Sequence, residues 1–555
     1  MAVKSDVRTG HDIAYLTRGH ASGCAGAMAY YTRSGDPPGT WEGRGCAALG
    51  VSGTVQADVA ERLYQQGIGP GGERIIRHAT PKTGEDQASA EALAIARYQK
   101  EHPFASASEI NAERTRIRAT SPGISRPYYD IPSSASGSIS VLHASLRVAA
   151  AHACDAGDDV TAAALDGEAQ AIEDALREAM REGLELLEAM ACYVRTGHHS
   201  ATTGEWRDGK GLVATSWLHT ISRDGDPQLH IHLAVLNAVQ RGDGVDDTWR
   251  AADGQHFYQL RHLYGVTVDR AFEQRLLDMG YAMTGRADGN GSEVGGVSQE
   301  VMDRFSSRAR AINGRLRTWV GQYTRQHGQP PSRRTVYLMG QQIAKDTRRP
   351  KAEGKRMAGG KDTGHLVSDE ERLKAWEEQT TADELQVLSA VYAEAKAYAA
   401  RSTARPRLAH ADKARAARIA VAEAQRQRSV WGISDLCLEI HRALPVGATP
   451  ADITEVAMLA ISGTVGADVV QVSPAPDLID VSPLGIRESD GQSIFRKPNT
   501  MRWSALSHLN LEDHVIGQAR RPIRPMVTEQ QVRAELDRHH QDLGVVRGGL
   551  YGLRD

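Results

Sequence analysis

The chain has 555 residues, and its 66 Lys and Arg against 69 Asp and Glu give a formal net charge of -3. This balance excludes a uniformly basic nucleic-acid binder. The five cysteines are scattered without a Cys-x-x-Cys pair, so neither a disulfide framework nor a zinc finger is indicated. The sequence shows no signal region and no membrane span. We therefore expect a soluble, cytoplasmic protein without membrane insertion.

Two adjacent tyrosines, Tyr30 and Tyr31, lie in a stretch rich in glycine and proline that extends to residue 45. Neighbouring side chains diverge on a helix and on a strand, so only one of the two can address a given atom. Before them, residues 12–16 have the pattern of a strand. Residues 53–110 are expected to be helical. Two aromatic packing residues are the alternative interpretation of the tyrosine pair.

Asp130 follows two further tyrosines and precedes a Ser-rich tract. We expect it to end or interrupt a strand. A carboxylate at such a place would accept a proton or orient an imidazole, and a simple turn residue is the alternative. Beyond it, apolar residues recur at three- and four-residue spacing from 158 to 190, which predicts a long amphipathic helix: Ile172, Leu176, Met180, Leu184 and Leu187.

The most informative stretch runs from His219 to residue 237. His230 and His232 flank one hydrophobe, and alternate side chains of a strand leave the same face. Residues 223–227 carry turn residues, so residues 211–219 should pair antiparallel with the second strand. Same-face pairing requires His219 to lie opposite His230 or His232. Three imidazoles would then meet and leave an open coordination position, as in catalytic metal sites. Three unrelated histidines on a half-buried strand are the alternative.

The second half of the chain is predicted to be mainly helical, and residues 301–360 contain 14 Lys or Arg against 3 Asp or Glu. This stretch suits a DNA backbone or a solvated helix face. The Gly-Lys-Ser/Thr signature of a P-loop is absent from the sequence. Helices are expected over residues 257–279, 299–320, 368–428 and 434–444, and a strand over 469–472. Residues 351–360 are expected to be a linker. The expected domains are 1–320, 321–430 and 431–555.

The histidine stretch resembles that of the MobF-type conjugative relaxases, the TraI/TrwC kind, in the HUH endonuclease superfamily. His230-Ile231-His232 matches the superfamily's His-hydrophobe-His motif. His219, Ser222-Arg223 and Asp226-Pro-Gln-Leu-His230 match the MobF form. Two further motifs support the resemblance, which covers roughly residues 8 to 320: Tyr30-Tyr31 with Trp41-Glu-Gly-Arg-Gly45 and Leu49-Gly-Val-Ser-Gly53, and Asp130 with its Ser-rich segment.

Many relatives carry two tyrosine pairs near the N-terminus, and they often carry a lysine in the segment after the aspartate. This chain has one tyrosine pair near its N-terminus, and Gly137 occupies the place of the lysine. Residues 503–515 resemble the lead-in to a helicase domain. We therefore expect this chain to correspond to the N-terminal relaxase portion of such relatives, without the helicase domain.

The resemblance implies an α/β (α+β) fold, with an antiparallel, palm-like sheet flanked by helices and followed by a mainly helical C-terminal region. It implies Tyr30 or Tyr31 as nucleophile, with Tyr30 preferred, and Asp130 as proton acceptor or orienting residue. His219, His230 and His232 would bind a divalent metal ion, which the ligands leave open as Mg, Mn, Zn or Ni. The implied reaction nicks one DNA strand, leaves a 5′-phosphotyrosyl link and later rejoins the strand.

The implied partners are single-stranded and hairpin DNA at an origin of transfer, relaxosome accessory proteins and a coupling protein. Candidate DNA-binding residues are Arg126, Arg223, Trp41 and Arg44. The aromatic side chains Trp41, Trp206, Tyr128 and Tyr129 either stack on bases or pack in the core. Three other functions remain open: a Rep-type replication initiator, a metal-dependent hydrolase that uses water, and a non-catalytic DNA-binding module.

Overall fold

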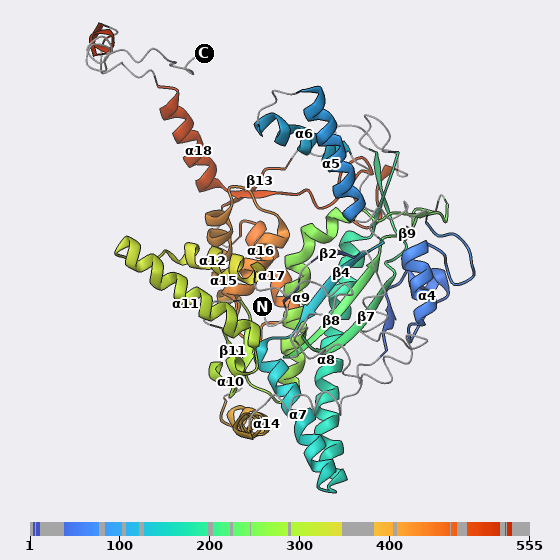
Figure 1. Cartoon of the computed structure of the whole chain (residues 1–555). Helices are drawn as coiled ribbons and strands as arrows, with labels where there is room; N and C mark the ends of the chain where they lie inside the picture. Colours follow the sequence, from blue (N-terminus) through green and yellow to red (C-terminus); the bar gives the residue numbers. More distant parts are fainter. Residues whose placement is uncertain are drawn as a thin grey trace.

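The computed structural model describes most of the chain, namely residues 4–5, 7–10, 38–76, 84–102, 107–120, 127–197, 204–222, 226–244, 246–286, 290–346, 382–402, 408–464, 466, 468–473, 485–521, 528 and 530–535. Its centre is a six-stranded antiparallel sheet in the order β1-β4-β8-β7-β3, with β2 also paired to β4 (Figure 1). The strands are β1 (Lys4–Ser5), β2 (Arg8–Gly10), β3 (Thr40–Glu42), β4 (Tyr128–Ser134), β7 (Ala214–Ile221) and β8 (Pro227–Leu236).

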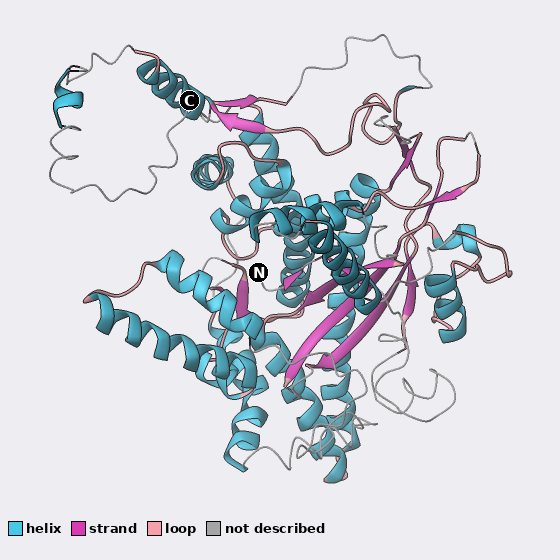
Figure 2. Cartoon of the chain, turned by 45° about the horizontal axis from the view of Figure 1, so that its top comes forward, coloured by secondary structure: helices cyan, strands magenta, loops and turns pink. Residues whose placement is uncertain are grey.

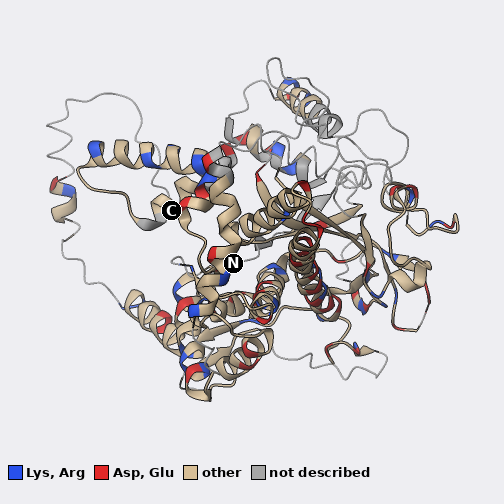
Figure 3. Cartoon of the chain, turned by 90° about the horizontal axis from the view of Figure 1, so that it is seen from below, with Lys and Arg blue, Asp and Glu red and all other residues tan. Residues whose placement is uncertain are grey.

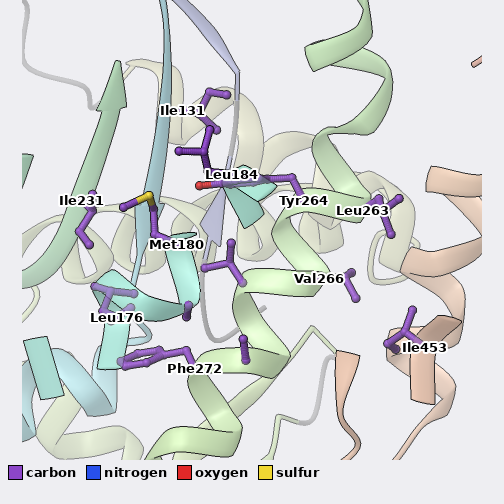
Figure 4. Packing of buried hydrophobic residues seen from close by; sticks show 14 of the residues in the cluster. Ile131, Leu176, Met180, Leu184, Ile231, Leu263, Tyr264, Val266, Phe272 and Ile453 are labelled. Carbon is purple, nitrogen blue, oxygen red and sulfur yellow. The ribbon is translucent and has the colours of Figure 1, made fainter. Parts of the chain in front are cut away.

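One face of the sheet is covered by three long helices, α7 (Gly137–Asp155), α8 (Asp159–Ala191) and α9 (Gln255–Asp278). Alternate residues of β4 and β8, such as Ile131 and Ile231, point into this layer (Figure 4). The apolar stripe predicted for α8 meets them there, because Leu176, Met180 and Leu184 belong to the same buried cluster. The predictions of helices over 158–190 and 257–279 are confirmed.

The opposite face of the sheet carries a smaller core. Buried residues of this core include Trp41, Tyr64, Tyr128 and Trp217. The short helices α3 (Cys46–Leu49), α4 (Ala57–Glu61) and η1 (Arg62–Gln66) supply the cover, and Figure 2 shows helices on both sides of the strands. This second core covers only part of the face, which leaves room beside it for the histidines.

Helices from the second half of the chain pack onto the same main core. They are α14 (Ala382–Arg401), α15 (His410–Gln427), α16 (Ile433–Ala443) and α17 (Pro450–Ile461). The main cluster includes Leu388 of α14 and Ile440 of α16 together with residues of α9. Packing therefore crosses both expected domain boundaries, at residues 320 and 430, and the division of the chain into domains stays a prediction.

Figure 3 shows Lys and Arg interspersed with Asp and Glu along the helices. Several residues of the remaining strands, among them Val194, Val294 and Trp503, belong to the main buried cluster. The remaining elements surround the central sheet and its helices (Figure 1). They are α5 (Gly84–Glu101), α6 (Ala107–Thr120), α10 (Gln299–Arg304), α11 (Ser307–His327), α12 (Arg333–Asp346), α18 (Leu506–Ala519), and the two-stranded ribbons β5 (Tyr193–Thr196) with β6 (Glu205–Asp208), β9 (Val239–Gln240) with β10 (Trp249–Arg250), β11 (Met283–Gly285) with β12 (Ser292–Val294), and β13 (Val469–Gln471) with β14 (Trp503–Ala505).

The expected α+β class, with a flanked antiparallel sheet and a mainly helical second half, is confirmed. Two local predictions were wrong. Asp130 does not end a strand but lies within β4, which is paired on both sides. The helix predicted over 299–320 is two helices, α10 and α11, separated at Phe305 and Ser306. The strand predicted at 12–16 and the linker at 351–360 lie outside the described residues.

Candidate active site

Three histidines of β7 and β8 gather on the sheet face opposite α7, α8 and α9. In the ladder between these strands His219 pairs with His230, and Trp217 pairs with His232. The ring centroids of His219 and His230 are 5.3 Å apart, those of His219 and His232 are 5.5 Å apart, and those of His230 and His232 are 5.2 Å apart. The predicted register is confirmed, and the three rings form a nearly equilateral triangle.

Two hydrogen bonds set the orientation of the β8 imidazoles. Nδ1 of His232 donates to Oδ1 of Asp130 over 2.8 Å, and Nδ1 of His230 donates to the backbone oxygen of Gln228 over 2.8 Å. Both oxygens act as acceptors, so the proton is assigned to Nδ1 in each ring. In this tautomer the lone pair of each ring is on Nε2, the atom through which the ring would bind a metal ion. A carboxylate behind a histidine is the usual arrangement at metal sites.

The ring triangle can be tested against the geometry of a bound ion. An ion about 2.1 Å from each ring nitrogen would lie roughly 3.2 Å from each centroid, and a tetrahedral angle then separates the centroids by about 5.2 Å. The observed separations of 5.2 to 5.5 Å fit this value. In the described part of the chain, no group of three or more His, Cys, Asp or Glu side chains is placed so that it could hold a metal ion as it stands. The fit therefore depends on ring spacing and tautomers.

The site is partly open to solvent. His232 is buried, whereas His219, His230 and Asp130 are half-buried. The neighbouring tyrosine Tyr64 is fully buried, and its hydroxyl donates to the backbone oxygen of Ala234 over 2.8 Å. Burial raises the pKa of this hydroxyl well above its usual value. A protonated, enclosed phenol of this kind cannot serve as the nucleophile.

The residue before β3 packs against a side chain of β7 close to this site. Gly39 immediately precedes β3, and a Cβ atom there would come within 2.6 Å of the Trp217 ring. Trp217 is buried, and its Nε1 donates to Oγ1 of Thr215 over 3.0 Å. Gly39 therefore lies directly against the ring of Trp217, the residue that pairs with His232 across the ladder.

The other candidate residues are placed as follows. Tyr30, Tyr31, Arg126 and Arg223 lie outside the described residues. Trp41 is only 5% exposed and packs in the smaller core, so its ring is not accessible to a base. The remaining aromatic candidates are also core residues: Tyr128, Tyr129 and Trp206.

Arg44 has an exposed side chain, and its Nε donates to Glu188 over 2.9 Å. It thus has a structural contact besides any contact with DNA. Sequence reasoning missed this glutamate and missed Trp217. The signal for Trp217 was present, because it lies two residues before His219 and therefore shares its face of the strand.

The TrwC relaxase family model matches residues 9–361, which is more than half of the 555 residues. The chain belongs to the TrwC relaxase family. Membership makes it a DNA relaxase, an enzyme that nicks one strand at a specific site and transfers it. Of the functions left open by the sequence, the Rep-type initiator and the non-catalytic DNA-binding module are not supported by this match.

Solved structures of TrwC are similar to this relaxase at low identity. The TrwC complex with mutant OriT DNA is 20% identical with a TM-score of 0.40, and the match covers 71% of this chain and 98% of that chain. The metal-free TrwC complex with OriT DNA is 21% identical with a TM-score of 0.41, covering 69% and 99%. The metal-bound complex is 20% identical with a TM-score of 0.41, covering 70% and 98%. No curated protein matches the chain.

Among the described residues, none of the helices is both long enough and apolar enough to cross a membrane.

Proposed function

We propose that this relaxase nicks one strand of origin-of-transfer DNA by tyrosine transesterification, with Tyr30 or Tyr31 as nucleophile. The observation that carries the proposal is the triangle of His219, His230 and His232 beside the point where the tyrosine-bearing segment joins the sheet. Tyr31 precedes the first described residue of that segment, Pro38, by seven residues. Seven fully extended residues span at most about 25 Å, so the Cα atom of Tyr31 lies within that distance of the Cα atom of Pro38.

The three histidines are proposed to bind a divalent cation, with Mg, Mn, Zn or Ni as candidates. When bound, such an ion would polarise the scissile phosphate and neutralise charge on its oxygens. Asp130 accepts a hydrogen bond from His232. This contact supports the orienting role for Asp130 over the role of proton acceptor, because the same oxygen is already engaged.

In the proposed reaction the phenol oxygen attacks the phosphorus of one DNA strand. The phenol loses its proton, the bond from phosphorus to the 3′ oxygen breaks, and the 3′ oxygen takes up one proton and leaves as a free hydroxyl. The new bond joins the tyrosine oxygen to the 5′ phosphate. One phosphodiester replaces another, and the 3′ hydroxyl can later reverse the step without ATP.

The proposed partners are single-stranded and hairpin DNA at the origin, relaxosome accessory proteins and a coupling protein. Arg126, Arg223 and the exposed Arg44 are the proposed phosphate contacts. The described cysteines Cys46, Cys154, Cys192 and Cys437 are free thiols. This supports the proposed cytoplasmic location, because thiols persist in a reducing compartment.

The test incubates the protein with single-stranded DNA from its own origin and Mn²⁺, and then identifies any covalent adduct by peptide mass spectrometry. We expect a phosphotyrosyl adduct on Tyr30, lost in Tyr30→Phe and retained in Tyr31→Phe. An adduct that persists in both variants would contradict the assignment of the nucleophile. A released 5′ phosphate without any adduct would instead favour the metal-dependent hydrolase.

A further inference from the structure

Two buried glutamates form hydrogen bonds that hold β3 and the residues after it in place. Glu42 is the last residue of β3, and Glu188 lies near the end of α8. Their side chains are 7% and 3% exposed, so both carboxylates are buried. Buried carboxylates are costly unless several donors satisfy them. Each of these two has such donors, and the donors come from chain segments that are far apart in sequence.

Glu188 joins three segments through two oxygens. Its Oε1 accepts the backbone N–H of Arg44 over 2.7 Å and the backbone N–H of Leu212 over 2.9 Å. Its Oε2 accepts Nε of Arg44 over 2.9 Å. One carboxylate on α8 thus ties the residues after β3 to the residues before β7.

Glu42 connects β3 to β7 and to α8. Its Oε1 accepts Oγ of Ser216 over 3.0 Å, and its two oxygens accept the guanidinium of Arg181 over 3.1 and 3.2 Å. Ser216 is on β7 and pairs with Thr40 in the ladder. Arg181 is on α8. This second carboxylate therefore sets β3 against the same strand and the same helix as Glu188.

The glycines of this segment permit the close approach. A Cβ atom on Gly43, whose φ is +93°, would lie 2.3 Å from the backbone oxygen of Leu212. A Cβ atom on Gly45 would lie 2.7 Å from the backbone oxygen of Gly211. The N–H of Gly45 donates to the oxygen of Leu212 over 2.9 Å. The Trp-Glu-Gly-Arg-Gly motif is thus a backbone-to-backbone junction, with its glutamate and arginine facing α8.

We infer that Glu188 and Glu42 are positioning residues for nicking, which set where the tyrosine-bearing segment leaves the sheet relative to the three histidines. The inference rests on the proposed function. β3 has three residues and pairs with β7 on one side. On its other side the N–H of Trp41 donates to the backbone oxygen of Gly53 over 2.8 Å, and the N–H of Val55 donates to that of Gly39 over 2.7 Å. Burial of Trp41 on one face and of Glu42 on the other specifies the register of so short a strand, and the polar contacts of Glu42 and Glu188 are part of that specification. A slip by one residue moves the segment by about 3.3 Å and reverses its faces.

The test is Glu188→Ala, assayed by single-turnover nicking of origin DNA with Mn²⁺. We expect the rate to fall at least about tenfold, because misplacement by about 1 Å is that costly. Affinity for the same DNA in EDTA should fall by no more than about threefold, because Arg44 is the one proposed phosphate contact among the described residues that bonds to Glu188, and its side chain is exposed with or without that partner. The readout specific to positioning is the ratio of Tyr30 to Tyr31 adducts, which should shift as the register loosens.

Two companion variants sharpen the test. Glu188→Gln should restore the wild-type ratio, because one amide oxygen can still accept both backbone N–H groups. Ser216→Ala removes a donor to Glu42 without leaving a new buried donor, and it should shift the ratio in the same direction but less. This second variant also serves if Glu188→Ala fails to fold.

The matched control is Glu173→Ala. Glu173 is another buried glutamate of α8, but its partners are His143, Arg147 and Arg177. We expect a lower melting temperature with an unchanged adduct ratio. A wild-type ratio in both Glu188→Ala and Ser216→Ala overturns the inference, as does an equal shift in Glu173→Ala. A wild-type protein that forms no tyrosine adduct refutes the proposed function instead.

Discussion

His219 on β7 lies directly opposite His230 on β8, and their ring centroids are 5.3 Å apart. Because side chains alternate along a strand, this pairing also brings His232 to the same face. A slip by one residue would turn His219 toward the face that the long helices cover. The irregularity of the ladder after His219 lies between this residue and Ile221, and so does not disturb the three histidines.

The contact between Asp130 and His232 predicts a metal-binding phenotype. Asp130→Asn should weaken binding of Mn²⁺ or Zn²⁺ about 10- to 100-fold, because the amide no longer holds the imidazole as a charged acceptor. Isothermal titration with the metal alone measures the affinity. The control is Asp247→Asn, since Asp247 is 74% exposed and pairs with Lys210 away from the site. Equal affinities for wild type and Asp130→Asn would refute the orienting role.

The packing of Gly39 on Trp217 predicts a loss of nicking on adding one methyl group. In Gly39→Ala the Cβ atom would need to move away from a buried ring that it approaches within 2.6 Å. We expect the single-turnover nicking rate to fall about tenfold or more, because the segment is displaced beside the site. Gly167→Ala in α8 is the control, because a Cβ atom there meets nothing within 4 Å. The idea fails if both variants nick at the wild-type rate.

The buried Glu173 predicts an acid-dependent loss of stability. Burial opposes its ionisation, but hydrogen bonds and charges from His143 and Arg147 prevail and lower the pKa of Glu173 to about 2. The folded state therefore gains stability from this carboxylate above its ordinary pKa of 4.5, and loses it as the pH falls from 4.5 toward about 2.

Urea unfolding at two pH values measures this effect. Between about pH 5.5 and pH 3, wild type should lose about 2 kcal/mol more than Glu173→Gln, which cannot titrate there. Other carboxylates contribute to both proteins and cancel in the difference. Parallel pH profiles for the two proteins would contradict the assignment.

The buried contacts of Arg270 in α9 predict that this residue stabilises the packing of α16 and α17. Its side chain is 3% exposed, and its donors reach Glu273 over 3.1 Å, the backbone oxygen of His441 over 2.8 Å and that of Pro445 over 3.0 Å. Arg270→Ala removes the guanidinium from the buried Glu273, which should cost about 3–5 kcal/mol. Hydrogen exchange should accelerate in residues 433–461.

A surface variant provides the comparison for this docking contact. Arg415 is 70% exposed and forms an ion pair with Asp412 on its own helix. Its replacement by Ala should change stability by less than about 1 kcal/mol. If Arg270→Ala exchanged no faster than Arg415→Ala, α16 and α17 would not depend on this network.

The sequence by itself determined the histidine hairpin and the long helices. The alternation that places His230 and His232 on one face, and the spacing that makes α8 amphipathic, are periodicities of the local backbone. They hold whatever surrounds them. The family resemblance, read from the same residues, agrees with the match over residues 9–361.

Only the tertiary structure decided what surrounds these elements. Asp130 was expected to end a strand, but pairing with β8 on one side and β2 on the other overrides its weak strand propensity. Trp41 was a candidate for DNA contact in the sequence, but in the structure its side chain is buried in the smaller core. Glu188 and Arg44 are 144 residues apart. Their contact depends on how a helix, a glycine turn and a short strand pack together, which no local pattern in the chain can specify.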